Sequence, residues 1–404
     1  MGDITKGLTS SEAGRYTDKV VAWRRDIHRH PELSQHEDRT ASLVAEVLTG
    51  LSLEVRRNVG GHGVVALLRG KKPGRTVALR ADMDALPLKE ETGLPYASEV
   101  EGVMHACGHD THTAMLLGAA CALADRREDI AGNVKFLFQP AEELNPTGGA
   151  PGMIADGALE DPHVDALFAL HVWPRFETGT VALKPGPQMG ASDRLFLTVH
   201  GKSAHGSAPD QGVDAIMIAS QVVCGLQSIV SRSVSPLDSA VVTVGTIKGG
   251  WRYNVIPDHV EMEGTVRTLR EETQALMPEL ISRTASGIAA SLGGSCDVKY
   301  VKGYPPMVND PALFELAAGS VRGAMGPEAL TVVEQPELGA EDFAFFARER
   351  PAVMGWLGCR PAGARPEDTA VLHNTRFCPD EGCFPYGVSF LASCALNFLN
   401  SAVS

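Results

Sequence analysis

Cysteine and histidine side chains gather between residues 104 and 112, at the start of a predicted helix. Cys107 and His109 are two residues apart, and in an extended or turn segment such residues can point to the same side. A thiolate beside an imidazole suits zinc or another borderline metal ion, and His105 and His112 lie alongside. The alternative is a buried free cysteine next to surface histidines, and this segment alone does not decide between the two.

Two adjacent carboxylates, Glu142 and Glu143, follow an apolar run that ends near Gln139. Neighbouring residues of a strand face opposite ways, but a turn after Pro140 could bring both side chains into one pocket. One carboxylate could then bind a metal ion while the other acts as a general base. A solvated strand end is the simpler interpretation when the pair is considered by itself.

Further candidates stand where other apolar runs end. His171 closes the run 164–170, His373 lies in the C-terminal part, and Asp82 and Asp84 follow the run 76–80. Each has an ordinary structural interpretation, either a hydrogen-bonded core histidine or an aspartate that caps a turn. Catalytic groups collect at strand ends in open α/β sheets, so the set as a whole favours a metal-dependent site. The sequence contains no phosphate-binding loop, dinucleotide fingerprint or nucleophile elbow that would favour another chemistry.

The elements that would position these residues alternate between helix and strand. Periodic apolar residues predict helices in the first fifty residues and over 111–126. Short apolar runs bounded by glycine and proline predict strands at 64–68, 76–80, 133–138, 164–170 and 352–357, and a closing helix is expected near 390–399. This alternation predicts an α/β fold, with a mixed sheet in the domain that carries the site.

The middle of the chain has a different pattern. Strands are predicted at 194–199, 240–247, 259–268 and 295–301, with helices at 213–230 and 271–292. The resulting β-α-β-β-α-β order is the ferredoxin-like pattern. We therefore predict a catalytic domain formed by residues 1–187 and 303–404, with a ferredoxin-like (βαββαβ) domain inserted at 188–302.

Composition and charge exclude several other classes of protein. The 404 residues carry 36 lysines and arginines against 49 aspartates and glutamates, a net charge of −13, so a basic face for nucleic acid or an anionic membrane is not expected. No segment reaches the roughly 20 uninterrupted apolar residues of a membrane span, and the N-terminus lacks the pattern of a signal peptide. We expect a cytoplasmic protein whose eight scattered cysteines are thiols or ligands, not a disulfide framework.

Taken in order, these motifs resemble the metal-dependent aminoacylase/carboxypeptidase family. The closest match is its amidohydrolase branch, which includes hippurate hydrolases, N-acyl-amino-acid amidohydrolases and indole-acetyl-amino-acid hydrolases. The resemblance covers nearly the whole chain, through segments 26–33, 80–87, 104–112, 139–143, 170–174, 201–205, 254–258, 339–343 and 372–374. The chain departs from the pattern after Asn374, where relatives usually show an aromatic and acidic run and two cysteines stand here.

The resemblance implies a binuclear site with two divalent metal ions per subunit, which could be zinc, manganese or cobalt. The implied metal ligands are Cys107, His109, Glu143, His171 and His373, with Cys107 as the bridge between the ions. Glu142 matches the general base, and Asp84 matches the carboxylate that orients it or one that supports the metal ligands from behind without touching the ions. Asp82 stands where many relatives outside this branch carry a metal-binding histidine, so we do not count it as a ligand.

By the same resemblance, the inserted domain is a lid that also mediates dimerisation. His205 matches a histidine that reaches the active site of a neighbouring subunit, where it would stabilise the oxyanion of the reaction. Asn254 and Arg267 match lid groups that hold the substrate carboxylate. These matches imply a homodimer or a dimer-based tetramer, with a small-molecule N-acyl amino acid as substrate and with neither nucleic acid nor a membrane as partner.

The implied reaction is hydrolysis of the amide bond of hippurate-like N-acyl amino acids by a metal-activated water, whose proton Glu142 takes. A dipeptidase and an N-carbamoyl-amino-acid hydrolase are the alternatives that use the same site. A relative without activity, serving as a binding or receptor module, is the alternative from another class. All the implied ligands and the general base are present in this sequence, which argues against that last alternative.

Overall fold

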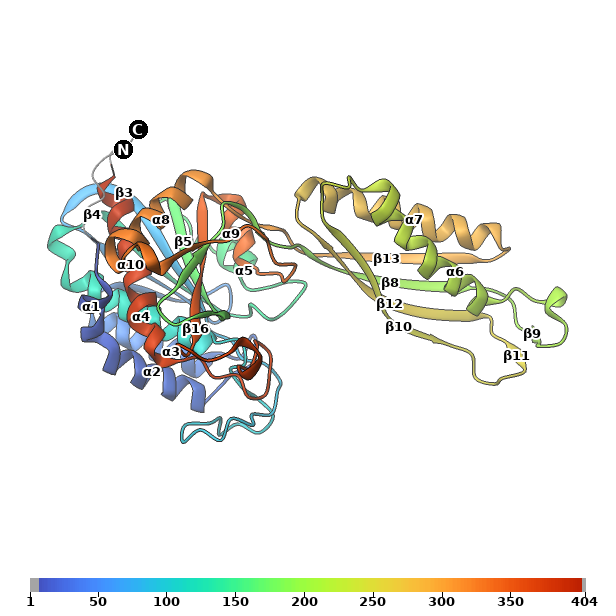
Figure 1. The fold of residues 1–404 in the computed structure, drawn as a ribbon, viewed down its shortest axis with the longest axis horizontal. Coiled ribbons are helices and arrows are strands. Elements are labelled where there is room, and N and C mark those ends of the chain that lie inside the picture. Colours follow the sequence, from blue (N-terminus) through green and yellow to red (C-terminus); the bar gives the residue numbers. More distant parts are fainter. Residues whose placement is uncertain (1–6, 402–404) are drawn as a thin grey trace.

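The computed structural model describes residues 7–401, which form a larger and a smaller lobe (Figure 1). The larger lobe is built on an eight-stranded mixed sheet with the order β1-β2-β4-β3-β5-β16-β6-β15. Its strands are β1 (Glu54–Val59), β2 (Gly63–Arg69), β3 (Lys72–Asp82), β4 (Ala131–Gln139), β5 (Ala166–Glu177), β6 (Val181–Leu183), β15 (Leu330–Val332) and β16 (Ala352–Arg360). The four central strands β4, β3, β5 and β16 are parallel.

Helices cover both faces of this sheet because its strands are apolar on both sides. Val77 and Leu79 of β3 belong to one buried cluster, while Ala78 between them belongs to the other, as expected for alternating side chains. The first cluster is covered by α1 (Ser10–Ala13), α2 (Thr17–Arg29), α3 (Asp38–Gly50), α4 (His109–Asp125), α8 (Pro311–Met325) and α10 (Phe384–Asn400). The second is covered by α5 (Ala150–Ala155) and α9 (Phe343–Glu349).

The smaller lobe has its own antiparallel sheet, with the order β10-β12-β8-β13. Its elements are β8 (Ser192–His200), α6 (Ala215–Ser228), β10 (Ala240–Gly249), β12 (His259–Thr268), α7 (Glu271–Ser291) and β13 (Ser295–Tyr304). This is the β-α-β-β-α-β order expected from the sequence. The pair β9 (Ala204–His205) and β11 (Val255–Ile256) lies at the far tip, and β7 (Gly186–Met189) pairs with β14 (Met307–Asn309) beside the larger lobe (Figure 1).

The predicted α/β fold with a mixed sheet is confirmed, while two local expectations were wrong or incomplete. Helix α4 begins at His109, two residues earlier than predicted. Helix α8 was not predicted, although its sequence carries a clear start signal: the side chain of Asp310 accepts from the amides of Ala312 and Leu313, and proline follows it. The domain boundaries and the role of the smaller lobe as a lid stay predictions.

Two helical stretches are long and apolar enough to cross a membrane by length and composition, Ala215–Ser233 and Glu381–Asn400. The second is 83% buried inside the larger lobe, as a core helix is, and the first is 33% buried. The buried side of the first, which includes Ile218 and Val222, packs in the core of the smaller lobe. Both helices therefore have an apolar face that the fold already uses.

Candidate metal centre and catalytic pocket

The predicted metal ligands come from one edge of the large sheet. Strands β3, β4 and β5 run parallel, so their carboxyl ends meet at this edge. Asp84 follows β3, Glu142 and Glu143 follow β4, and His171 lies in β5 beyond its pairing with β3. The turn predicted after Pro140 is present: Ala141 has a φ of 56°, in the left-handed region. It breaks the alternation of the strand, so both glutamates face one pocket.

Cys107 lies at the centre of the five predicted ligands. Its Sγ is 3.4 Å from Nε2 of His171 and 3.3 Å from Nε2 of His373. The liganding atoms of Cys107, His109 and His171 lie within 4.8 Å of one another, and so do those of Cys107, Glu143 and His373. Two triads that share one sulfur are the arrangement a bridging thiolate needs.

The two buried histidines each direct one ring nitrogen towards this cluster. Nδ1 of His171 donates to the carbonyl oxygen of Val172 at 2.8 Å, which leaves Nε2 as the acceptor that faces Cys107. Burial lowers the pKa of His171 well below its usual range, so the ring is neutral, as a metal ligand must be. Nδ1 of His109 is 3.1 Å from the Asp84 carboxylate, and its Nε2 is buried with no hydrogen-bond partner among residues 7–401. A carboxylate or carbonyl behind each imidazole is typical of metal ligands.

The acidic groups around Cys107 favour the binding of cations. Burial raises the pKa of the Cys107 thiol well above its usual range, and the nearby carboxylates of Glu143 and Glu142 raise it further. Without a cation the sulfur therefore holds its proton, whereas a divalent ion stabilises the thiolate. One thiolate, one carboxylate and three imidazoles form a donor set that zinc and similar ions take, so these residues fit a metal centre.

Glu142 differs from the ligands in its surroundings. Its side chain is buried, and burial together with the carboxylates of Glu341 and Glu143 raises its pKa well above the usual range. Asp84 accepts from the amide of Glu143 at 2.9 Å as well as facing His109. Of the two roles expected for Asp84, this geometry supports the orientation of ligands.

Asp82 and His112 pair with each other beside the cluster. Asp82 also contacts the cluster, because its carboxylate lies 3.8 Å from Nε2 of His109, and the possible ligand atoms of Asp82, His109 and His112 lie within 4.8 Å of one another. Nδ1 of His112 donates to Asp82 at 2.6 Å, and its Nε2 accepts from the amide of Val172 at 2.9 Å. Arg80 donates to Asp82 at 2.8 Å and to Asp342 at 2.9 Å. Arg80 was not among the predicted site residues. The sequence does contain a sign of this role: Arg80 is a charged residue in the apolar part of β3, and such a residue is seldom buried without an ion-pair partner.

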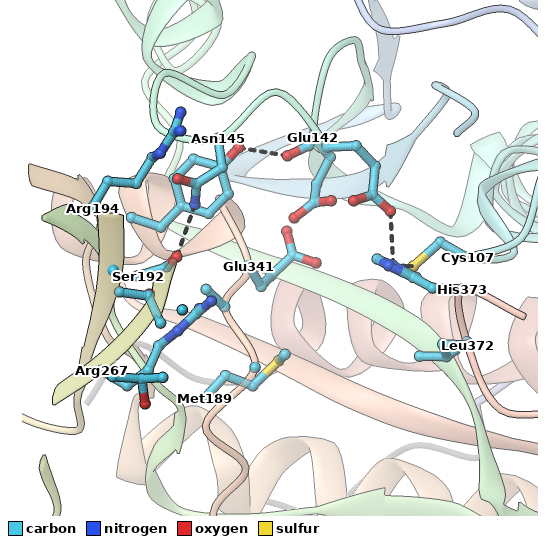
Figure 2. A pocket seen from close by; sticks show the side chains of 18 of the residues that line it. Cys107, Glu142, Asn145, Met189, Ser192, Arg194, Arg267, Glu341, Leu372 and His373 are labelled. Carbon is cyan, nitrogen blue, oxygen red and sulfur yellow. Dashed lines mark hydrogen bonds and ion pairs between the residues drawn. The ribbon is translucent and has the colours of Figure 1, made fainter. Parts of the chain in front are cut away.

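A cleft of about 820 Å³ opens from the metal cluster towards the smaller lobe. Figure 2 shows Arg194 and Arg267 of the smaller lobe across this pocket from Cys107 and His373. Arg194 is paired with Glu263. Arg267, which is partly buried, has no carboxylate within ion-pairing distance in the part of the chain that the structure describes. The pocket therefore joins a metal-type cluster to an unpaired cation.

The structure does not bring His205 and Asn254 to this pocket. Both lie at the tip of the smaller lobe, where His205 of β9 pairs with Val255 of β11 (Figure 1). His205 is therefore part of a short strand. His205 is exposed and lies 2.7 Å from the Ser207 hydroxyl through Nδ1. Of the three residues assigned to the lid, Arg267 alone lines the pocket of its own chain.

An α/β fold with this cluster at the carboxyl edge of its sheet defines a metal-dependent hydrolase. The family model described as peptidase family M20/M25/M40 matches residues 78–397. The chain is 40% identical over 385 residues to thermostable carboxypeptidase 1 of Saccharolobus solfataricus, covering 95% of this chain and 96% of that protein. It is 45% identical to an N-acyl-L-amino acid amidohydrolase of Geobacillus stearothermophilus, over 75% of this chain and 82% of that one.

A solved structure of similar shape is a dinuclear metal-binding peptidase of the M20 family from Bacillus subtilis. It superposes with a TM-score of 0.83 at 34% identity, over 96% of this chain and all of that one. The chain therefore belongs to peptidase family M20/M25/M40. The predicted enzyme class, a metal-dependent amidohydrolase, and the predicted pair of divalent metal ions are confirmed.

We expect Cys107→Ser to lose at least one of the two ions together with its activity. A serine hydroxyl keeps its proton at neutral pH and is a poor bridge beside a thiolate. Elemental analysis and turnover measured on the same sample check this. Cys121→Ser, at a buried free thiol of α4, is the matched control and should keep both ions. Two full equivalents with normal kinetics in Cys107→Ser would remove Cys107 from the ligand set.

We expect Gly108→Ala to lower both metal content and thermal stability. Gly108 has a φ of 91°, and an added Cβ would lie 2.4 Å from Cγ2 of Val172, beside His171. Gly102→Ala is the control, since Gly102 has a φ of 74° but nothing within 4 Å of its Cβ position. The control should show only the backbone cost of about 1–2 kcal/mol and keep its metal. Equal effects in the two variants would contradict a role for the close contact at Gly108.

Proposed function

We propose that the protein hydrolyses the amide bond of N-acyl amino acids, with hippurate-like compounds as its substrates. The observation that carries this is the pocket itself. It places the unpaired guanidinium of Arg267 across from the cluster around Cys107 (Figure 2). A guanidinium suits a carboxylate, and the space between suits an amide with an acyl group. The name of the Geobacillus relative, an N-acyl-L-amino acid amidohydrolase, supports the same substrate class.

Five side chains would hold the two ions: Cys107, His109, Glu143, His171 and His373. When bound, divalent ions of this kind polarise a carbonyl and lower the pKa of water towards neutrality. Asp84 would fix the ring of His109 and the peptide of Glu143, so that both ligands keep their direction. The ligand set is preorganised by contacts that need no metal.

Glu142 would act as the general base. It lies within 4.8 Å of the liganding atoms of His109 and Glu143, close enough to take a proton from water at the cluster. From this position it could accept a proton from that water and then deliver it to the leaving nitrogen. Glu341 and Asp342 stand beside it, and Arg80 holds both.

His205 and Asn254 would act from a second copy of the chain. They lie together at the tip of the smaller lobe, away from the metal cluster of their own chain (Figure 1). The lobe is long enough to carry the tip away from its own active site, which supports a dimer in which each tip completes the partner's pocket. There His205 would donate to the oxyanion, and Asn254 would assist Arg267 in binding the carboxylate. A dimer-based tetramer and a cytoplasmic location stay predictions.

A peptidase is the second candidate, because the Saccharolobus relative is named a carboxypeptidase, and an N-carbamoyl-amino-acid hydrolase would use the same groups. A turnover screen separates them. N-acetyl, N-benzoyl and N-carbamoyl amino acids and a dipeptide are each offered with Zn, Mn or Co. We expect the N-benzoyl or N-acetyl compounds to give the highest kcat/KM. Preference for the dipeptide would replace the first candidate by the second.

We expect Glu142→Gln to keep both metals and to lose turnover by about 10²–10⁴-fold, because the amide preserves shape but cannot accept a proton. Glu143→Gln is the neighbouring control and should lose metal as well as activity. Steady-state kinetics and elemental analysis of both variants check the division of roles. Glu142→Gln that keeps more than about a tenth of wild-type turnover would refute the general-base role, given the usual size of that contribution.

We expect His205→Ala to lose activity with its metal content unchanged. Mixing it with inactive Glu142→Gln under subunit exchange should restore up to about a quarter of wild-type activity, because half of the randomly paired dimers then carry one intact composite site. His163→Ala, at an exposed histidine of the larger lobe, is the control and should stay active. Proven exchange without recovered turnover would count against the trans role, and a fully active monomer would end it.

A further inference from the structure

The loop that carries Glu142 and Glu143 is held from both points where the chain crosses between the lobes. Ser192 opens β8, and Tyr304 closes β13. Nδ2 of Asn145 donates to the Ser192 hydroxyl at 3.0 Å, a contact drawn in Figure 2. The hydroxyl of Tyr304 donates to the carbonyl oxygen of Glu142 at 2.6 Å. The first residue of the smaller lobe and its last therefore both bind the catalytic loop.

The Tyr304 side chain is buried and held on several sides. Its side chain is 2% exposed, and its ring meets Phe345 edge-on at 5.9 Å. Burial raises the pKa of the phenol, and the carboxylates of Asp342 and Glu142 raise it further, so the hydroxyl stays a donor. On the other side of the loop, the amide of Glu143 donates to Asp84 at 2.9 Å. The peptide that follows Glu142 is thus fixed at its N–H by the larger lobe and at its carbonyl oxygen by Tyr304.

The two crossings are tied to each other and to the smaller lobe. The buried carboxylate of Asp193 accepts from the Tyr300 hydroxyl at 2.6 Å, from the Gly303 amide at 2.8 Å and from Gln274 of α7 at 2.9 Å. A Cβ on Gly303 would lie only 2.0 Å from the carbonyl oxygen of Ser192, so the crossings touch. Tyr304 therefore belongs to a strand of the smaller lobe while its hydroxyl and ring contact the larger one, so a change in the orientation of the smaller lobe would act on this hydroxyl.

We propose that Tyr304, together with Asn145, is a positioning residue for Glu142, which links the orientation of the smaller lobe to the placement of the catalytic carboxylate. A substrate bound to Arg267 on β12 would then affect the position of Glu142. The connection runs through the sheet of the smaller lobe to β13, which ends at Tyr304. The inference rests on the proposed role of Glu142 as general base. The competing explanation is an ordinary buried hydrogen bond that stabilises the fold and has no bearing on turnover.

The test compares Tyr304→Phe with Tyr300→Phe in the full-length protein. Each variant loses one phenolic hydroxyl of β13 whose bond measures 2.6 Å, but Tyr300 bonds Asp193 and not the catalytic loop. The first measurement is amide hydrogen exchange in the metal-free protein. We expect Tyr304→Phe to speed amide exchange in segment 141–145 by at least about fivefold, because the segment loses its hydrogen bond from the Tyr304 hydroxyl. Tyr300→Phe should leave that segment unchanged.

The second measurement is the kinetics of the metal-loaded variants. We expect Tyr304→Phe to lower kcat by about tenfold or more while KM stays within about twofold, because displacement of a catalytic group acts on the reaction step and not on binding. Metal content should stay at two equivalents. Tyr300→Phe should keep kcat within about twofold of wild type, even where the two variants lose similar thermal stability.

Equal losses of kcat in the two variants, or unchanged exchange in segment 141–145, would overturn the positioning role. Asn145→Ala provides a second route if Tyr304→Phe does not fold: it removes the tie to Ser192, and it should lower kcat more than KM rises. Full activity in Asn145→Ala would likewise contradict the proposal. The exchange result does not depend on Glu142 acting as a base, so failure of that role in Glu142→Gln is recognised separately.

Discussion

Arg80 is a buried guanidinium on which the whole catalytic edge depends. It binds Asp82 from its own strand, and Glu341 and Asp342 from a segment about 260 residues later in the chain. Asp342 in turn accepts from Gln139 and from the amides of Gly149 and Ala150, which close the loop that carries the glutamates. Removing one member of a buried ion pair leaves a charge unsatisfied and typically costs 3–5 kcal/mol. This network holds together the parts of the larger lobe that come before and after the smaller one.

The same network leaves the site short of positive charge. Six carboxylates lie at or beside it, at positions 82, 84, 142, 143, 341 and 342. Among residues 7–401, Arg80 is the one arginine that forms an ion pair with any of them. This lack of positive charge raises the pKa of groups at the site. Burial raises the pKa of Asp342 to about 7 even though Arg80 opposes the shift. For His109, burial favours the neutral ring, but Asp82 and Asp84 outweigh it and raise the pKa to about 10. Divalent ions would relieve this imbalance, so metal binding and folding of this edge are linked.

Local patterns were enough to predict the central strands of the large sheet, most of the long helices and the β-α-β-β-α-β order, because alternating or periodic apolar residues reflect which faces are buried. They missed helix α8 and the outer strands β1, β6 and β15. Local patterns were not enough where a single residue changes the backbone conformation. Gly108 adopts a left-handed conformation, so helix α4 begins directly after it, at His109. Arg80 and Tyr304 act through partners 162 or more residues away, and no local pattern carries that information. The resemblance in motifs indicated His205 as a candidate residue. Its distance from the metal cluster of its own chain is set by the length of the smaller lobe, which no local pattern gives.

The insertion of the smaller lobe also sets an order of assembly during synthesis. The sheet of that lobe pairs only its own strands, β8, β10, β12 and β13, so it is complete once residue 304 has been made. The sheet of the larger lobe is not, because β5 needs β16 as a neighbour and the two are separated by about 180 residues. The predicted ligand His373 and two partners of Arg80, Glu341 and Asp342, come later in the chain than the whole smaller lobe. During synthesis the smaller lobe can thus fold before the larger one. Until β16 is made, the early strands of the large sheet remain incompletely paired, and the polar residues at their carboxyl ends remain exposed to solvent.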